Sequence, residues 1–163
     1  SARPLRYMDR YVTVKQGEVF YITEALAALE GMEKGPAGNT SLAAAFSLAQ
    51  ELDQDQIIVA QETEYTGAGK HIQPQLAFAR KNGIELKFGD PRTEVPGENI
   101  VFPAYPGQLK AQESDLDRMR SSLIRRQASH ATGALTDADI AYLVEETKSS
   151  PEFVKKVLES LGK

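Results

Sequence analysis

The stretch of the chain that most limits its fold lies between residues 35 and 70. A turn containing glycine and proline at residues 35–41 leads into an alanine-rich segment, and a continuous apolar run follows at residues 57–60. A second glycine-rich turn comes next. An apolar run after a helix is typical of a parallel strand that is buried on both faces. Ligands bind beyond the carboxyl ends of such strands, so we expect any chemistry beside residues 61–70.

The composition excludes several classes of protein. The chain has 163 residues, of which 41% are hydrophobic, so it is long enough for one packed domain with or without an appendage. Its net charge of −4 argues against partners such as nucleic acid or an anionic membrane surface. No apolar run approaches the ~20 residues that a membrane span needs.

The remaining compositional features bear on the setting and on metals. The chain has no cysteine, and His71 and His130 lie far apart, so we predict no metal site and a cytoplasmic setting. The sequence starts at Ser1 rather than at a methionine. We therefore expect a processed product or a piece of a longer protein.

Hydrophobic spacing and turn residues predict an α/β arrangement in residues 1–107, after an irregular start at residues 1–9. Asn39 or Thr40 is the expected N-cap of the second helix, because both side chains accept from free N–H groups of a first turn. The expected elements are a strand at 11–14, a helix over about 18–30 ended by Gly31, a helix from about 39 to the turn at 53–55, the buried strand at 57–60, a short helix around 76–79, and strands at 84–88 and 99–102.

The composition changes after residue 107, where a helical tail is expected at residues 108–163. Ser114 and Asp115 are suited to begin one helix, and Thr136 is suited to begin the next. Ser150 followed by a proline begins the last helix, since proline is favoured at the first helical position.

Two segments carry a resemblance to a known family. The segment GPAGNTSLAAA at residues 35–45, with the strand and glycine turn after it, resembles the C-terminal part of fold-type II pyridoxal-phosphate enzymes of the threonine-synthase group. Closer still, RPLRYMDRY at residues 3–11 and QETEYTGAGKHIQPQ at residues 61–75 resemble the β subunits of 2-amino-4-oxopentanoate thiolase. The resemblance covers nearly all of this chain and only the C-terminal third of the family's chain.

The resemblance implies a fold and an activity. The fold would be α/β, part of a parallel-sheet pyridoxal-phosphate fold-type II domain followed by a helical tail. The implied enzyme is an acyltransferase of ornithine degradation, which cleaves 2-amino-4-oxopentanoate with coenzyme A to acetyl-CoA and alanine. It works with a small α subunit and is expected to be an oligomer. Another fold-type II lyase or synthase and a non-catalytic docking module remain alternatives.

The family's Schiff-base lysine and its phosphate-binding glycine loop lie upstream of the segment that this chain resembles. The lysines near the expected site, Lys34, Lys70, Lys81 and Lys87, do not match the family's Ser-x-Lys motif. We therefore expect no catalytic residue in this chain. By itself it would be inactive, and it would need the missing N-terminal part to hold pyridoxal phosphate.

The resemblance places Glu62 and Thr63 at the cofactor. Thr63 would offer a hydroxyl to the pyridine nitrogen, whereas Glu62 would hold a protonated ring nitrogen. A shift of one residue along a strand exchanges the side chain that faces the site, so both alternatives stay open. The glutamate of the family's related turn is replaced by Gly35, so its role is not carried over.

Three further expectations concern the surroundings of the site. Lys70 is a candidate contact for the substrate or for a phosphate of coenzyme A. The turn at residues 35–41 either binds an anion through free N–H groups or serves only as the entry to a helix. If the chain folds alone, its small parallel sheet should have an exposed edge strand where upstream strands would pair.

Overall fold

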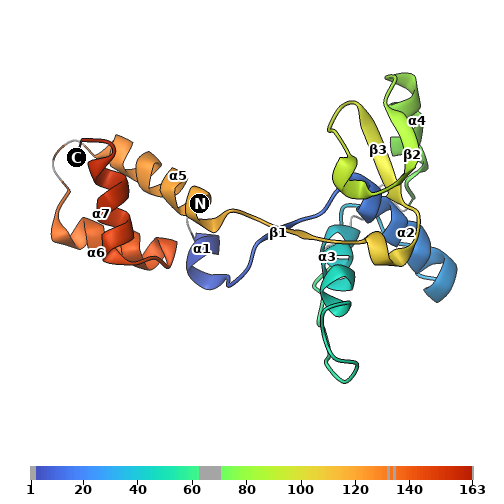
Figure 1. Ribbon diagram of the computed structural model, residues 1–163, viewed down its shortest axis with the longest axis horizontal. Coiled ribbons are helices and arrows are strands. Elements are labelled where there is room, and N and C mark those ends of the chain that lie inside the picture. Colours follow the sequence, from blue (N-terminus) through green and yellow to red (C-terminus); the bar gives the residue numbers. More distant parts are fainter. Residues whose placement is uncertain (1–2, 63–70, 132, 134, 163) are drawn as a thin grey trace. The chain divides into compact units, whose positions relative to one another are not determined.

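The structure, a computed structural model, describes residues 3–62, 71–131, 133 and 135–162 (Figure 1). It divides into two compact units. We call Val12–Gln112 the α/β unit, and Ser1–Tyr11 together with Glu113–Lys163 the helical unit. The sequence-based division at residue 107 differs in its first part, because it assigns the N-terminal residues to the α/β part.

The α/β unit contains a small parallel sheet beside three helices. Strand β2 pairs with β3 in parallel, with Leu86 opposite Ile100. The strands are β1 (Val12–Thr13), β2 (Glu85–Gly89), β3 (Asn99–Pro103) and β4 (Gln112–Glu113), of which β1 and β4 form a second two-stranded sheet. The helices are α2 (Gln16–Glu30), α3 (Asn39–Ala49) and α4 (Gln73–Lys81), with short 3₁₀ turns at Pro91–Thr93 and Pro106–Gln108.

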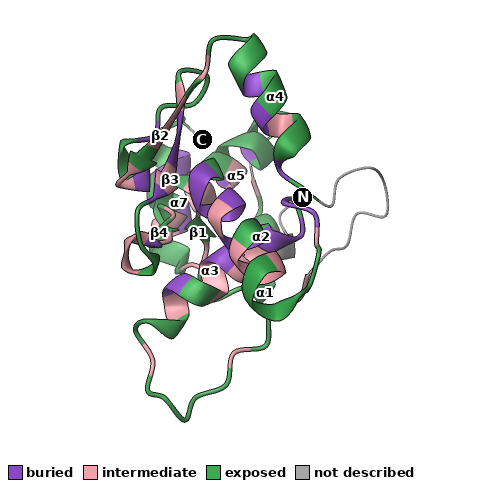
Figure 2. Ribbon diagram, turned by 90° about the vertical axis from the view of Figure 1, so that its right-hand side faces the viewer, coloured by how far each residue is buried: buried purple, intermediate pink, exposed green. Residues whose placement is uncertain are grey.

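These elements confirm most of the predicted ones. Gly31 ends α2 in the left-handed conformation, with φ of 65°, as the sequence indicated. The core of the unit has two parts, which appear as the buried residues in Figure 2. One cluster consists of Phe20, Ile72, Leu76, Ala79 and Ile100, and the other of Val19, Ile22, Ala43 and Leu109.

The N-terminus of α2 lies directly against β3. A Cβ atom on Gly17 would lie 1.9 Å from the carbonyl oxygen of Val101, so the contact requires glycine. The buried carboxylate of Glu94 accepts hydrogen bonds from the backbone N–H groups of Gln16 at 3.0 Å, Gly17 at 3.0 Å and Val101 at 3.1 Å. One side chain therefore satisfies two free N–H groups of the helix and one of the strand.

A second buried carboxylate, that of Glu18, lies in the same region. It accepts from the backbone N–H of Lys15 at 2.6 Å and from that of Lys110 at 2.8 Å. Burial raises the pKa of Glu18, and the charge of Glu94 acts in the same direction. The two carboxylates therefore connect the start of α2 to β3 and to the segment after it.

The helical unit is built from α1 (Arg3–Tyr7), α5 (Leu116–His130), α6 (Asp137–Thr147) and α7 (Pro151–Glu159). The N-caps of the last three helices are Asp115, Thr136 and Ser150, which confirms the predicted helix starts. The core consists of Ile124, Ala128, Leu143, Val154, Val157 and Leu158. Among the described residues, no helix is both long enough and apolar enough to cross a membrane.

The prediction that residues 1–9 are irregular is wrong, because Arg3–Tyr7 form helix α1. This helix packs on α6, where Leu5 is buried. The Arg6 guanidinium forms ion pairs with Glu145 and Glu146. Contacts with residues about 140 positions away thus order a segment that carries no local helix signal.

The predicted N-cap of α3 is also wrong. Gly38 precedes the helix, and Asn39 is its first residue. The side chain of Asn39 is fully buried, and its Nδ2 donates to the hydroxyl of Thr23 at 2.9 Å. The side chain is therefore held by helix α2 through its amide nitrogen, and its oxygen does not cap the first turn.

The predicted buried strand at residues 57–60 does not form. The exposed fractions of Ile57 and Val59 are 89% and 91%. Neither of the sheets in the described part of the chain includes these residues. An apolar run becomes a buried strand only where neighbouring strands and layers cover it, and the described residues supply none.

We expect Gly17→Ala to disrupt the α/β unit. The added methyl group collides with the backbone of β3, and overpacking of this kind costs about 3 kcal/mol in free energy of unfolding. Urea denaturation followed by circular dichroism measures the loss. Gly133→Ala is the control, because nothing lies within 4 Å of its added Cβ. Equal stabilities of the two variants would contradict the close approach.

We expect the stability of the chain to depend on the ionisation of Glu18. Because its pKa is raised above the ordinary value of 4.5, the folded state binds the proton more tightly than the unfolded state. This contribution is complete below pH 4.5 and is lost as the pH rises through the raised pKa. The free energy of unfolding should therefore fall more steeply from pH 4.5 to about 7 in the wild type than in Glu18→Gln.

The Glu18→Gln variant also loses an acceptor, so its stability is lower at every pH and the slope is the informative quantity. The exposed Glu98→Gln serves as the control and should keep the slope of the wild type. Parallel curves for the wild type and Glu18→Gln, measured by urea denaturation across the pH series, would contradict the prediction.

Candidate functional site

An open groove of about 570 Å³ lies at the start of α3, within the α/β unit. Its walls come from the segment around β1, from the turn that enters α3, from the first turns of that helix and from the chain just before Glu62. The lining residues are Val12, Thr13, Val14, Ala37, Gly38, Thr40, Ser41, Ala44 and Gln61. Most of these side chains are small, which leaves the backbone of the turn close to the groove.

One hydrogen bond joins the two turns that the sequence singled out. The hydroxyl of Ser41, in the first turn of α3, donates to the carbonyl oxygen of Gln61 at 2.7 Å. The turn at residues 35–41 and the segment that begins at residue 61 are therefore neighbours in space. This bond fixes the backbone immediately before Glu62.

The Glu62 side chain is half-buried. Its Oε1 atom is shielded from solvent and has no hydrogen-bond partner among the described residues. A shielded carboxylate oxygen without a donor is costly, so such an atom is suited to accept from a ligand. Of the predicted site residues, only Glu62 can be placed, since Thr63 and Lys70 lie outside the described residues.

The turn at residues 35–41 acts at least partly as a helix entry. The backbone N–H of Asn39 donates to the carbonyl oxygen of Gly35 at 3.3 Å, which closes the turn. That N–H group is engaged within the chain and is not offered to an anion. The Oδ1 atom of Asn39 is buried without a hydrogen-bond partner in the described part of the chain.

Among the residues that the structure describes, no lysine lines the groove. Lys87, one of the lysines considered in the sequence, instead pairs with Glu85 at 3.3 Å. Within the described ranges, no cluster of histidine, cysteine, aspartate or glutamate side chains could hold a metal ion. Both His71 and His130 are exposed. The described lining thus offers small side chains and the hydroxyl groups of Thr13, Thr40 and Ser41, and Glu62 follows directly after its last residue, Gln61.

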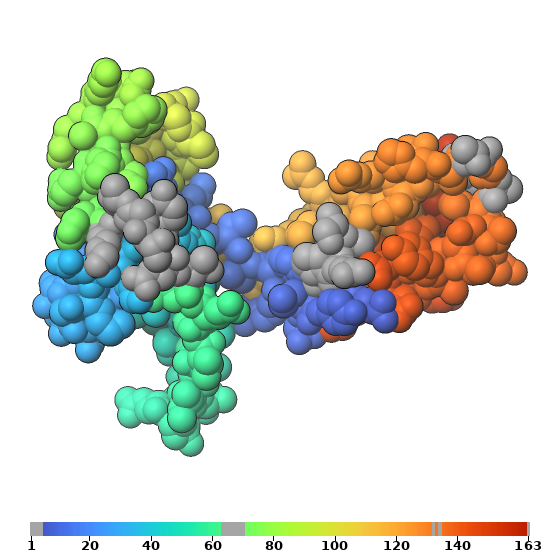
Figure 3. Space-filling view, turned by 180° about the vertical axis from the view of Figure 1, so that it is seen from behind, coloured from blue at the N-terminus to red at the C-terminus, as the bar shows by residue number. Residues whose placement is uncertain are grey.

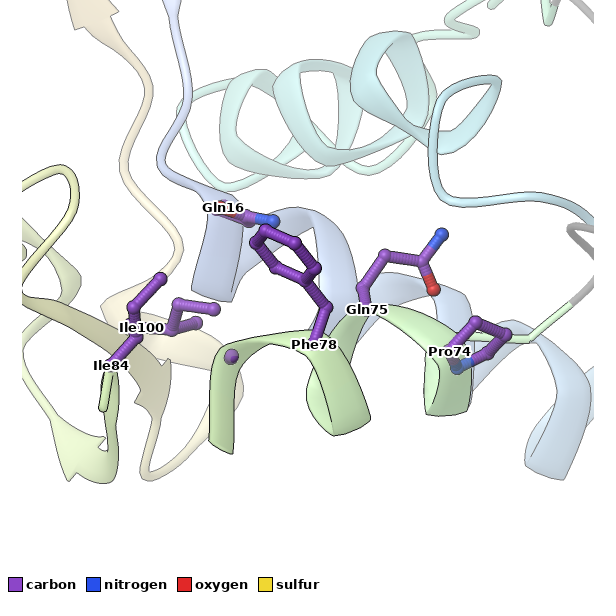
Figure 4. A pocket seen from close by; sticks show the side chains of 7 residues that line it. Gln16, Pro74, Gln75, Phe78, Ile84 and Ile100 are labelled. Carbon is purple, nitrogen blue, oxygen red and sulfur yellow. The ribbon is translucent and has the colours of Figure 1, made fainter. Parts of the chain in front are cut away.

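A smaller pocket of about 310 Å³ lies between α4 and the sheet (Figure 4). Ile84 and Ile100 come from the sheet side, and Phe78 comes from α4 with its ring near Gln16. The complete lining is Gln16, Pro74, Gln75, Phe78, Ala79, Ile84 and Ile100. These described residues include no ionisable side chain, so the pocket is suited to packing rather than to acid–base chemistry.

Sequence reasoning missed two parts of this site. It placed the site beside residues 61–70, but it did not find the Ser41 bond to Gln61 or the wall supplied by residues 12–14. A serine in the first turn of a helix is the one local signal of such a bond, because its hydroxyl can donate to a nearby carbonyl oxygen.

Comparison with curated proteins relates the chain to thiolase β subunits. It is 66% identical over 162 residues to the 2-amino-4-ketopentanoate thiolase beta subunit of Acetoanaerobium sticklandii, which is 99% of this chain and 34% of that protein. It is 58% identical over 163 residues to a protein of the same name from an unknown prokaryotic organism, again with 99% and 34% covered. The chain thus spans about a third of the length of these curated relatives. No family model and no solved structure matches it.

We expect Ser41→Ala to loosen the segment at Gln61. The variant loses a hydroxyl that donates to the carbonyl oxygen of Gln61 at 2.7 Å and also lies 3.2 Å from that of Gly38, and this shared bond contributes about 1 kcal/mol to the free energy of unfolding. Hydrogen exchange should be faster in peptides that cover residues 56–62, and urea denaturation should show the matching loss. Thr40→Ala, at an exposed neighbouring position on the same helix, should change neither measurement. An unchanged exchange rate in Ser41→Ala would show that the bond does not hold this segment.

Proposed function

We propose that this chain is part of the β subunit of a pyridoxal-phosphate-dependent thiolase that cleaves 2-amino-4-oxopentanoate, also called 2-amino-4-ketopentanoate. The observation that carries the proposal is the 66% identity to a β subunit of that name along 99% of this chain. In the reaction, the C3–C4 bond of the substrate breaks. The acetyl group joins the sulfur of coenzyme A, and a proton added at C3 completes alanine.

Glu62, which follows the groove residue Gln61, fits a cofactor with a hydrogen-bond donor. The shielded Oε1 of Glu62 lacks a donor among the described residues, and a protonated ring nitrogen of pyridoxal phosphate would provide one. When bound, pyridoxal phosphate supplies the electron sink for cleavage of a carbon–carbon bond. The fold-type II assignment is part of the same proposal and rests on the resemblance of residues 35–45.

The residues around Glu62 then have defined tasks. Glu62 holds the donor of the cofactor, and Ser41 holds the backbone in front of Glu62 through the bond to Gln61. Ala37 and Gly38 line the groove with a methyl group and a hydrogen atom, so the flat ring of the cofactor would have room beside them. Thr63 remains the alternative partner of the ring nitrogen.

The described lining of the groove includes no lysine of the kind that such a reaction requires, so the chain would supply one side of the site only. The other side, with the Schiff-base lysine and the phosphate loop, would come from the missing N-terminal part of the longer polypeptide. Lys70 would contact the substrate or a phosphate of coenzyme A. A small α subunit, an oligomeric assembly and a cytoplasmic location complete the proposal.

A second candidate function is that of a docking module without catalysis. It is favoured by the exposed apolar side chains of Ile57 and Val59, which are typical of a surface that another chain covers. Another fold-type II lyase or synthase would use the same groove on a different substrate. The thiolase and the docking module differ in one respect. Only the thiolase requires that the complete polypeptide binds pyridoxal phosphate.

The test of the thiolase function compares two polypeptides. One is the 163-residue chain, and the other is a chimera in which this chain replaces the matching third of the Acetoanaerobium sticklandii relative. After incubation with pyridoxal phosphate and borohydride reduction, intact-mass spectrometry should show the mass of the reduced cofactor on the chimera alone. With the small α subunit present, the chimera should form acetyl-CoA from 2-amino-4-oxopentanoate and coenzyme A.

We expect Glu62→Gln in the chimera to lower kcat/KM by about 30-fold or more, because a charge-assisted hydrogen bond is worth about 2 kcal/mol or more. Glu51→Gln, at an exposed position just after α3, is the control and should retain full activity. A chimera that gains no mass on reduction would refute the cofactor. An active Glu62→Gln chimera would leave Thr63 as the partner of the ring nitrogen.

A further inference from the structure

The segment between α3 and Glu62 is the most exposed apolar part of the α/β unit. The exposed fractions of Ile57 and Val59 are 89% and 91%, and Ala60 is exposed as well. Figure 2 shows the loop after α3 coloured as exposed along most of its length. In the space-filling view, the same loop projects from the unit (Figure 3). Three of the four apolar residues 57–60 are thus exposed to solvent, and Ile58 is half-buried.

The sequence of this segment is suited to one environment. In an extended chain, Ile57 and Val59 point to one face, and Ile58 and Ala60 point to the other. Both faces are therefore apolar, and three of the four side chains are β-branched, as is typical of strands. A strand of this kind is stable only where a layer covers each face and other strands pair with both edges.

The neighbouring helix α3 also leaves apolar surface uncovered. Among its residues, only Asn39, Ala43 and Ser47 are buried. The exposed fraction of Phe46 is 42%, and Ala44 is only half-buried in the groove wall. The uncovered helix surface and the apolar run follow each other in the chain, so one partner can cover both.

The length of the curated relatives indicates which partner covers the apolar run and the surface of α3. This chain spans 34% of each curated relative and matches it along 99% of its own length. About two thirds of the longer polypeptide is therefore available to cover this surface. A second copy of this chain is a poorer partner, because pairing through the same run leaves one edge and both faces of each strand open.

We propose that residues 57–60 form an interior β-strand whose edges pair with strands from the remaining two thirds of the longer polypeptide. The contact is made by backbone hydrogen bonds and apolar side chains, since the run itself carries no charge. We call residues 57–60 and the uncovered surface of α3 the seam, because they form the interface between the chain described here and the rest of its polypeptide. The inference rests on the length of the relatives and holds whether or not the longer protein is a thiolase.

Hydrogen exchange tests the seam directly. The backbone amides of residues 57–60 are compared in the 163-residue chain and in the chimera with the rest of the Acetoanaerobium sticklandii relative, without pyridoxal phosphate or substrate. We expect these amides, which belong to neither sheet of the described part of the chain, to exchange at least about 100-fold more slowly in the chimera than in the chain alone. Equal exchange in the two proteins overturns the proposal. Protection in the chain alone that grows with its concentration also overturns it, because the partner is then a second copy.

Substitution provides an independent test. Val59→Asp should leave the melting temperature of the 163-residue chain unchanged, because the side chain is 91% exposed there, and should prevent folding or lower the melting temperature in the chimera. Val59→Thr keeps the branched shape but adds a hydroxyl, and it should lower the melting temperature of the chimera by about 2 °C or more. Gln54→Asp places the same charge in the same loop outside the run, and it should leave both proteins unchanged.

An unchanged melting temperature for Val59→Asp and Val59→Thr in the chimera would show that the run is not buried, and it would overturn the proposal. These measurements need no cofactor and no turnover. A chimera with a protected strand that binds no pyridoxal phosphate would therefore refute the thiolase function and leave the seam intact.

Discussion

The α/β unit depends on one buried carboxylate. Glu94 accepts from the N–H groups of Gln16 and Gly17 at the start of α2 and from that of Val101 in β3. The N–H groups of Gly17 and Val101 would be buried without this acceptor if the carboxylate were absent, and each would then cost about 1–3 kcal/mol. The packing of Phe20 on Ile100 follows from the position that this contact gives to the helix. The groove at α3 is in turn built on the other side of α2, where Thr23 holds Asn39.

Local signals predicted the elements well, because caps and helix stops act over a few residues. Gly31 and Ser150 mark a helix end and a helix start, and both were readable from the sequence. Contacts between distant residues were not readable. The hydroxyl of Thr23 lies 16 residues from Asn39 and determines the role of that side chain, and Arg6 orders α1 through glutamates about 140 residues away.

The sequence predicted where along the chain the candidate site lies, but it did not predict which residues contact one another there. The strand-end rule located it beside Glu62, although the strand itself does not form in the described residues. The pattern of residues 57–60 is typical of a strand covered by layers and neighbouring strands, which the described residues do not supply. The bond from Ser41 to Gln61 depends on how a loop returns to a helix, which no spacing in the sequence indicates. Thr63 and Lys70 stay predictions.

The helical unit is discontinuous along the chain, and this has a consequence for synthesis. Helix α1 precedes the α/β unit, whereas the helix α6 on which it packs follows that unit. During translation, α1 therefore leaves the ribosome long before its partner exists, and it has too few residues to persist as an isolated helix. The intervening Val12–Gln112 can reach its own compact state in that interval. Assembly of the helical unit thus comes after the α/β unit has been synthesised.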